Sequence, residues 1–152
     1  MDNVITITQS EFTEVAKVHN LISEFAGSEV DFAGRIQGKT HLIIVAHHNN
    51  ALAGYSISYD RFNDGSLYCW MGGVVDNKRR LGVYQAMADY REKYAKENGF
   101  TKLCLKTRNS RRGMMCWLVK QGWLCVAVEQ QVDPKENSII FEKELSPLPE
   151  NF

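Results

Sequence analysis

The stretch that decides the fold runs from Val74 to Tyr84 and reads V-V-D-N-K-R-R-L-G-V-Y. It overlaps the end of an apolar run, Leu67 to Val75, which predicts a buried strand. It leads into a segment whose apolar residues recur every three or four positions, as on one face of a helix. A short polar and basic turn lies between the two. The sequence therefore predicts a strand, a tight turn and a helix in immediate succession.

This turn has the chemistry of a phosphate site. Gly82 falls in the first turn of the helix, where the missing side chain lets a ligand approach the backbone closely. The first N–H groups of a helix have no partner within it, and the helix dipole places roughly half a positive charge there. Arg79 and Arg80 add whole charges at the same place. Two interpretations stay open here: a site for a phosphate group, or a solvated basic turn.

Two common phosphate-binding fingerprints, G-x-x-x-x-G-K-[ST] and a G-x-G-x-x-G after a strand, do not occur in the sequence. The pattern R-x-x-G-x that follows V-V-x-x-x instead resembles the acyl-CoA pyrophosphate loop of the GNAT superfamily of N-acyltransferases, which is written R/Q-x-x-G-x-G/A. Arg79 matches the first position and Gly82 the middle glycine, whereas Tyr84 stands where a small residue is usual.

Two further segments carry this resemblance. Residues 68–74, Y-C-W-M-G-G-V, look like the Y-x-W-φ-G-G-V strand (φ apolar) of one GNAT branch, and Asn109 with Gly122-Trp123 resembles the N…G-F segment. The expected element order, β-α-α-β-β-β-α-β-α-β-β, is also the GNAT order, so the resemblance covers nearly the whole chain. It implies an α/β fold with a central mixed sheet of about seven strands flanked by about four helices.

The resemblance also implies a binding site. In GNAT proteins two neighbouring parallel strands part at a bulge, and the pantetheine arm of CoA enters the gap; here the two strands would be Leu67–Val75 and Thr101–Thr107. Backbone groups of Gly73, Val74 and Val75 would pair with the pantetheine and face the thioester oxygen. The other expected CoA-binding residues lie in the turn, at the start of the helix and after the second strand: Arg79, Arg80, Leu81, Gly82, Val83, Tyr84 and Asn109.

Acyl transfer to an amine requires removal of a proton from the amine, stabilisation of an oxyanion and protonation of the leaving thiolate. Many GNAT enzymes carry a glutamate on the fourth strand and a tyrosine four residues before the G-F glycine. Those positions here are Gly72 and Leu118, so both usual groups are missing. We expect Tyr68 and Asp60 as substitutes, with Tyr59 a further candidate, because they lie on or beside strands that should reach the cleft. A buried structural tyrosine is the competing interpretation of each tyrosine. Cys116 on the following helix and a chain of water molecules are the other possible routes for the proton.

A chain of 152 residues with 44% apolar and 24% charged residues has the size and composition of one ordinary globular domain. We expect a domain over residues 1–145 and a frayed tail over residues 146–152. No run approaches the roughly 18 apolar residues of a membrane span, and the first residues lack a basic n-region. The cytoplasm is therefore the expected compartment, with no membrane partner.

The net charge is zero, but residues 74–112 hold eleven Lys or Arg against four Asp or Glu. A positive potential concentrated at the proposed site fits a polyanionic small molecule such as CoA better than a nucleic acid, whose binders usually show a basic balance over the whole domain. The spacing of the cysteines and histidines provides no closed ligand set, so no metal is expected. The four cysteines are expected in the core, and His47-His48 in a turn.

We thus expect an N-acetyltransferase that moves an acetyl group from acetyl-CoA to a primary amine of a small molecule or a protein. An acyl-CoA-binding module with little or no catalysis is the alternative that the missing Glu and Tyr favour. A nucleotide binder unrelated to CoA is a third interpretation. An edge strand near the C-terminus could pair between subunits, which would give a homodimer.

Overall fold

The computed structural model describes residues 2–146, which form a seven-stranded sheet in the order β1-β2-β3-β4-β5-β7-β6. The expected α/β class and element order are confirmed, with two added turns of 3₁₀ helix, η1 and η2. The expected tail, residues 146–152, lies outside the described residues apart from Ser146. In chain order the elements are β1 (Ile5–Gln9), α1 (Phe12–Leu21), α2 (Phe32–Ile36), β2 (His41–His48), β3 (Ala51–Tyr59), β4 (Ser66–Val74), η1 (Asp76–Lys78), α3 (Val83–Glu97), β5 (Lys102–Arg108), α4 (Arg112–Lys120), β6 (Leu124–Glu129), η2 (Pro134–Glu136) and β7 (Ser138–Glu144).

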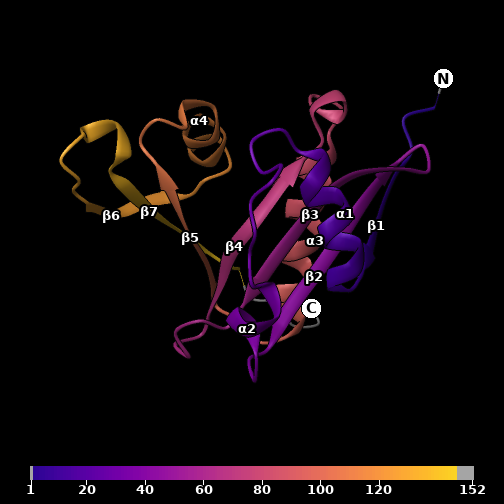
Figure 1. The fold of residues 1–152 in the computed structure, drawn as a ribbon. Helices are drawn as coiled ribbons and strands as arrows, with labels where there is room; N and C mark the ends of the chain where they lie inside the picture. The colour runs from indigo at the N-terminus through magenta and orange to yellow at the C-terminus, as the bar shows by residue number, and fades with distance from the viewer. Residues whose placement is uncertain (1, 147–152) are drawn as a thin grey trace.

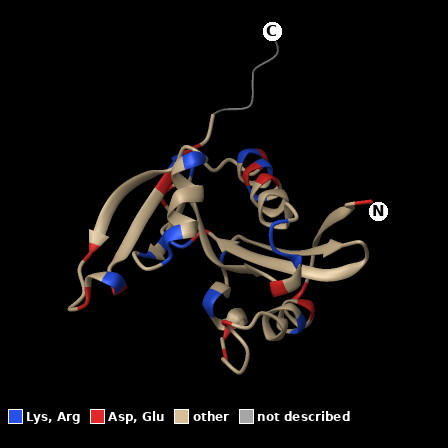
Figure 2. Ribbon diagram, turned by 90° about the horizontal axis from the view of Figure 1, so that it is seen from above, with Lys and Arg blue, Asp and Glu red and all other residues tan. Residues whose placement is uncertain are grey.

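Helices cover both faces of the sheet formed by β1 to β4. Helices α1 and α2 lie on one face and α3 lies on the other (Figures 1 and 2). The alternation of side chains along each strand divides the core accordingly: Tyr55 and Ile57 pack with α1, whereas Ile44 and Val74 pack with Met87 of α3. Helix α4 packs with β5 and β7 in a third cluster, whose residues include Leu118.

Strands β4 and β5 are parallel neighbours that pair only at their beginnings. Their register is Ser66 with Lys102, Leu67 with Leu103 and Tyr68 with Cys104. Beyond that point β4 continues to Val74 and β5 continues to Arg108, while β5 stays paired with β7 along its whole length. The strands β5, β7 and β6 therefore diverge from β4 as one unit (Figure 1). This is the parting of strands that the resemblance implied.

A bulge interrupts β4 just after the parting. Ile57 pairs with Met71 and Ser58 with Cys69, which leaves Trp70 as the extra residue. The bulge precedes the two glycines of β4 instead of falling on them. Gly73 has a different explanation, since a Cβ built there would lie 2.9 Å from Cδ1 of Ile22 and 3.0 Å from the ring of Phe25. Glycine at this position is required because the segment after α1 packs against the strand backbone.

Two expectations about histidine and cysteine are wrong. His47 and His48 belong to β2, and the turn consists of Asn49 and Asn50, whose φ angles of 49° and 69° suit a two-residue hairpin. Cys116 and Cys125 are exposed, not in the core. Cys125 is exposed because β6 is an edge strand on which all six residues are exposed. Pairing of β6 with a second copy, and hence a homodimer, stays a prediction.

Among residues 2–146, no helix is both long enough and apolar enough to cross a membrane. The cytoplasmic location stays a prediction.

Candidate functional site

A cavity of about 390 Å³ lies where β4 and β5 part. Its walls come from both strands, from α3 and α4, and from the segment after α1. Four of its lining side chains are cationic, and none of the lining residues found within the described chain is an Asp or a Glu. The cations are Arg91, Lys106, Arg108 and Arg111. Such a cavity suits a ligand that carries negative charge.

The turn before α3 has the geometry of an anion site. Arg80 and Gly82 both adopt the left-handed conformation, with φ of 64° and 89°. The first hydrogen bond of the helix runs from the N–H of Ala86 to the carbonyl of Gly82, and the N–H groups of residues 80–85 have no acceptor within residues 2–146. Left-handed residues in such a turn let successive N–H groups converge on an anion. The expected phosphate site therefore has free donors.

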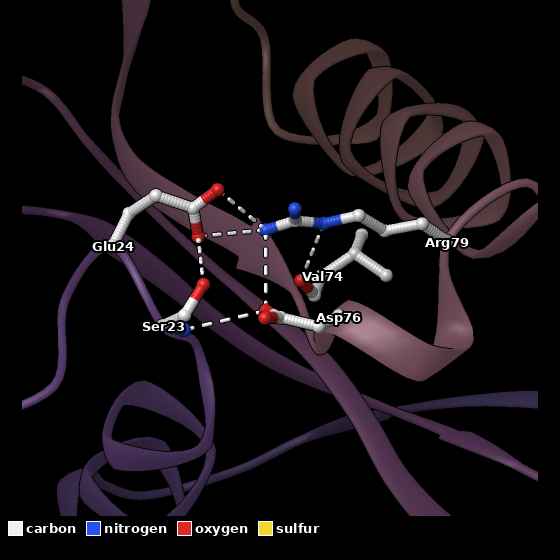
Figure 3. A network of polar contacts seen from close by, with 5 residues as sticks. All are labelled: Ser23, Glu24, Val74, Asp76 and Arg79. Carbon is white, nitrogen blue, oxygen red and sulfur yellow. Dashed lines mark hydrogen bonds and ion pairs between the residues drawn. The ribbon is translucent and has the colours of Figure 1, made fainter.

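Arg79 is held by a network of polar contacts (Figure 3). Its Nη2 lies 2.9 and 2.7 Å from the two carboxylate oxygens of Glu24 and 3.5 Å from Oδ1 of Asp76, and its Nε donates to the carbonyl of Val74 at 3.3 Å. The N–H of Ser23 also donates to Asp76. The hydrogen bond with Arg79 lowers the pKa of Glu24. Arg79 thus joins the segment after α1 to the end of β4, and two carboxylates compensate its charge.

Of the two expected catalytic residues, the structure brings only Tyr68 to the cavity. Tyr68 is 7% exposed and is the last residue of β4 paired with β5. Burial raises the pKa of its phenol, so the side chain is protonated near neutral pH and suits an acid better than a base. Asp60 does not line the cavity; its Oδ1 accepts a hydrogen bond from the N–H of Asn63 at 3.0 Å and stabilises the turn after β3.

Leu118 is not at the cavity. It is 0% exposed and belongs to the core cluster beside Leu67 and Leu103. The residues of the α4 region that line the cavity are Arg111 and Met114. Leu118 therefore does not occupy the place of a proton donor to the leaving thiolate, which the resemblance implied, whereas Gly72 does line the cavity as expected.

Of the expected CoA-binding residues, only Tyr84 is among the residues found to line this cavity within the described chain; those not found there are Gly73, Val74, Val75, Arg79, Arg80, Leu81, Gly82, Val83 and Asn109. Tyr84 lines the cavity, and its ring lies edge-on to that of Trp117 with 4.8 Å between the ring centroids. Asn109 instead makes structural hydrogen bonds, because its Nδ2 donates to the carbonyl of Pro134 at 3.1 Å and its N–H to the carbonyl of Asn137 at 2.9 Å. Asn109 ties the end of β5 to the loop before β7, and its role as a CoA ligand stays a prediction.

Sequence reasoning missed several residues that line the cavity. Arg91 is one of them, and a signal existed, because it lies four positions after Met87 on the buried face of α3. Arg108 and Arg111 flank Asn109, where the sequence is densely basic. Phe25 gave no signal, since it follows the end of α1 and belongs to no periodic pattern.

The histidines are not gathered into a metal site. His19 lies between the hydroxyls of Tyr55 and Ser28, at 2.8 and 2.9 Å from its two ring nitrogens. His48 lies 2.6 Å from Asn3. In the part of the chain that the structure describes, no group of three or more His, Cys, Asp or Glu could hold a metal ion. That no metal is needed stays a prediction.

Solved structures share this fold over almost the whole chain. The ribosomal-protein-S18-alanine N-acetyltransferase from Escherichia coli superposes with a TM-score of 0.80 at 20% identity, covering 98% of this chain and 99% of its own. This chain has the GNAT acetyltransferase fold. Similarity to the IAA acetyltransferase from Bacillus cereus has a TM-score of 0.76 at 16% identity, over 93% of this chain and all of the other.

A GNAT-family acetyltransferase from Elizabethkingia anophelis, solved with acetyl-CoA bound, has a TM-score of 0.75 at 17% identity and covers 95% of this chain and 100% of its own. No protein-family model and no curated protein sequence matches this chain. The likeness is therefore one of GNAT fold, and it agrees with the motifs in the turn before α3 and in β4.

Proposed function

We propose that this protein is an acyl-CoA-dependent N-acetyltransferase that moves an acetyl group from acetyl-CoA to a primary amine. The parting of β4 and β5 beside a turn with free N–H groups carries this proposal. Within residues 2–146, the edge of β4 that faces β5 has no partner strand beyond Tyr68, so its peptide groups can pair with the amides of a pantetheine arm. We expect the pyrophosphate to be held by the N–H groups of residues 80–85, which have no acceptor among the same residues.

Charge supports the same ligand. Of the four cations that line the cavity, Lys106 and Arg108 form ion pairs with Glu129 and Glu136, which leaves Arg91 and Arg111 without a carboxylate partner among residues 2–146, and CoA is a polyanion. Solved GNAT-fold proteins from Bacillus anthracis and Elizabethkingia anophelis contain acetyl-CoA, which supports acetyl-CoA as the donor here. Their identities of 20% and 17% to this chain leave the acceptor open.

The chemistry required of the site is modest. The amine nitrogen attacks the thioester carbon, and donors at the strand backbone stabilise the oxyanion. Tyr68 is protonated near neutral pH, so we assign removal of the amine proton to water and not to Tyr68. Tyr68 would instead contact the acceptor at the closed end of the slot.

An acyl-CoA-binding module without catalysis is the second candidate. Two observations favour it: Gly72 offers no carboxylate on β4, and the lining residues of the α4 region, Arg111 and Met114, include neither a carboxylic acid nor a tyrosine. Both candidates require CoA to bind, and only the first requires turnover.

The test combines calorimetry of CoA binding with thiol release from acetyl-CoA over a panel of polyamines, amino acids, aminoglycosides and peptides. We expect CoA to bind more tightly than ATP at equal concentration, and at least one amine to give stoichiometric CoA and acetylated product. Binding without turnover on any amine would favour the binding module. ATP binding at least as tight as CoA binding would contradict both candidates.

Arg79 gives a second test of the donor site. When CoA binds, the Arg79 guanidinium would leave Glu24 and form a charge-assisted hydrogen bond with the pyrophosphate. Arg79→Ala should therefore weaken CoA binding by about 1.5–3 kcal/mol. Glu24→Gln should strengthen binding, because it removes a carboxylate that lies 2.7 Å from the guanidinium. Calorimetry measures both, with Lys93→Ala on the exposed side of α3 as the control for loss of one charge. An unchanged dissociation constant in Arg79→Ala would limit Arg79 to joining the two segments.

A further inference from the structure

Arg91 is a buried cation that lacks a carboxylate partner. It lies on α3, is 4% exposed and lines the cavity between β4 and β5. Its Nε has no hydrogen-bond partner within residues 2–146, and no ion pair of Arg91 is found among them. The other three cations that line the cavity, Lys106, Arg108 and Arg111, are exposed. A buried guanidinium without a counter-charge is costly, so its presence calls for an explanation.

The neighbours of Arg91 do not supply the missing negative charge. Cys69 of β4 acts on it, but burial raises the pKa of that thiol and keeps it neutral. Glu92 of α3 is already shared by Lys96 at 3.7 Å and Lys143 of β7 at 3.3 Å. Tyr84 is the remaining titratable neighbour and contributes a phenol. Burial disfavours the charged form of Arg91, but the pKa of a guanidinium lies so far above neutral pH that the side chain stays charged.

Arg91 lies at the closed end of the slot. Cys69 and Leu105, which line the cavity with it, directly follow the last paired residues of β4 and β5. A CoA molecule that enters at the turn before α3 and runs along β4 brings its sulfur toward this end. Tyr84, which lies seven residues before Arg91 on α3 and lines the same cavity, acts on the guanidinium, as expected for a side chain that leans toward the N-terminus of its helix.

We propose that Arg91 is a catalytic residue that stabilises the leaving CoA thiolate by its positive charge, in place of a side-chain proton donor. This inference rests on the proposed function. When the amine nitrogen forms its bond to the carbonyl carbon and the C–S bond breaks, the electron pair of that bond goes to sulfur. The proton of the amine goes to water. The thiolate would then lie beside a buried cation, where opposite charges interact more strongly than in bulk water.

A guanidinium near the sulfur should change the pKa of the CoA thiol, and this effect does not depend on the acceptor. An opposite charge within about 4–6 Å lowers the pKa of a group that ionises to an anion by about 1–3 units. The pKa of the thiol of bound CoA should therefore be at least about one unit below that of free CoA. The ultraviolet absorbance of the thiolate, titrated with pH in the saturated complex, measures it. The same titration with desulfo-CoA is subtracted, so that the cysteines and tyrosines of the protein do not contribute.

In Arg91→Met the lowered pKa should be lost, which leaves about tenfold less thiolate at a pH between the two values. Arg91→Lys should retain most of the shift, because it retains the charge, and Arg91→Gln should lose it. Turnover with an acceptor found in the amine panel should fall by about 10²–10³-fold in the two uncharged variants. The affinity for desulfo-CoA should fall much less than turnover does, because Arg91 is proposed to act on the sulfur and not on the phosphates. Lys93→Met, which removes one charge from the exposed side of the same helix, should leave the thiol pKa of bound CoA and the turnover unchanged.

Folding does not confound this test. Arg91→Met replaces a buried charge by an apolar side chain of similar length, which is usually neutral or stabilising; if it fails to fold, Arg91→Gln provides the uncharged form. An equal thiol pKa in the wild type and the uncharged variants would overturn the inference while the CoA site stands. A wild-type protein that binds neither CoA nor desulfo-CoA would instead overturn the proposed function itself.

Discussion

Replacement of Gly82 by Val is expected to weaken CoA binding by about 3 kcal/mol or more, about a hundredfold. Gly82 has φ of 89°, a conformation that a β-branched residue adopts only with strain. Relief of that strain would rearrange the turn whose N–H groups at residues 80–85 are free. Each charge-assisted hydrogen bond lost there costs about 1.5–3 kcal/mol. The valine side chain would also stand where a phosphate must approach the backbone.

The other end of the same helix provides the matched control. Gly99 has φ of 81°, and a Cβ built there meets no atom within 4 Å. Gly99→Val therefore introduces the same backbone strain and should lower the melting temperature similarly, but it leaves the turn before α3 intact. Calorimetry at a temperature where both variants are folded should show the loss of CoA affinity in Gly82→Val alone. Equal affinities in the two variants would remove the phosphate site from this turn.

The sequence predicted the element order because most of the signals are local. Apolar alternation marked β3, and a run of residues spaced by three or four marked α3, whose end at Glu97 is signalled by the following Asn98-Gly99. The place where β4 and β5 part could not be read in this way. Strand β4 is largely apolar and β5 mixes apolar residues with Lys, Thr and Arg, and nothing in either sequence shows that pairing ends at Tyr68 and Cys104. That feature came from the resemblance to GNAT proteins.

The residues of the candidate site also divide into those that local sequence predicts and those that only the fold brings together. Free N–H groups at the start of α3 follow from local helix geometry, so Gly82 and its neighbours were predictable. The ion pair between Arg79 and Glu24 was not predictable, because the two residues are far apart in the sequence and only the fold brings them together. Asp60 was expected at the cleft, but a local contact explains its position. Its carboxylate accepts a hydrogen bond from the N–H of Asn63 within the same turn. An acidic residue at a strand end is often such a turn residue.

Leu118 provides the last prediction, because the structure separates its two interpretations. As a cavity residue it would tolerate Leu118→Tyr, and the added phenol would assist the leaving thiolate. As a residue of the core, 0% exposed and packed with Leu67 and Leu103, it should not tolerate the larger and polar side chain. Overpacking costs about 1–3 kcal/mol, and a buried hydroxyl without a partner costs about 1–3 kcal/mol more. We therefore expect Leu118→Tyr to destabilise the fold without raising the rate.

Leu118→Ala should lower the free energy of unfolding by about 2–5 kcal/mol, through lost burial and the cavity left behind. Val119→Ala is the control, because the adjacent side chain is 64% exposed and its truncation should change stability by no more than about 0.5 kcal/mol. Urea denaturation measures all three variants. A Leu118→Tyr variant as stable as the wild type, with faster release of CoA from acetyl-CoA, would show that this position reaches the cleft. The role proposed for Arg91 would then be shared with a proton donor on α4.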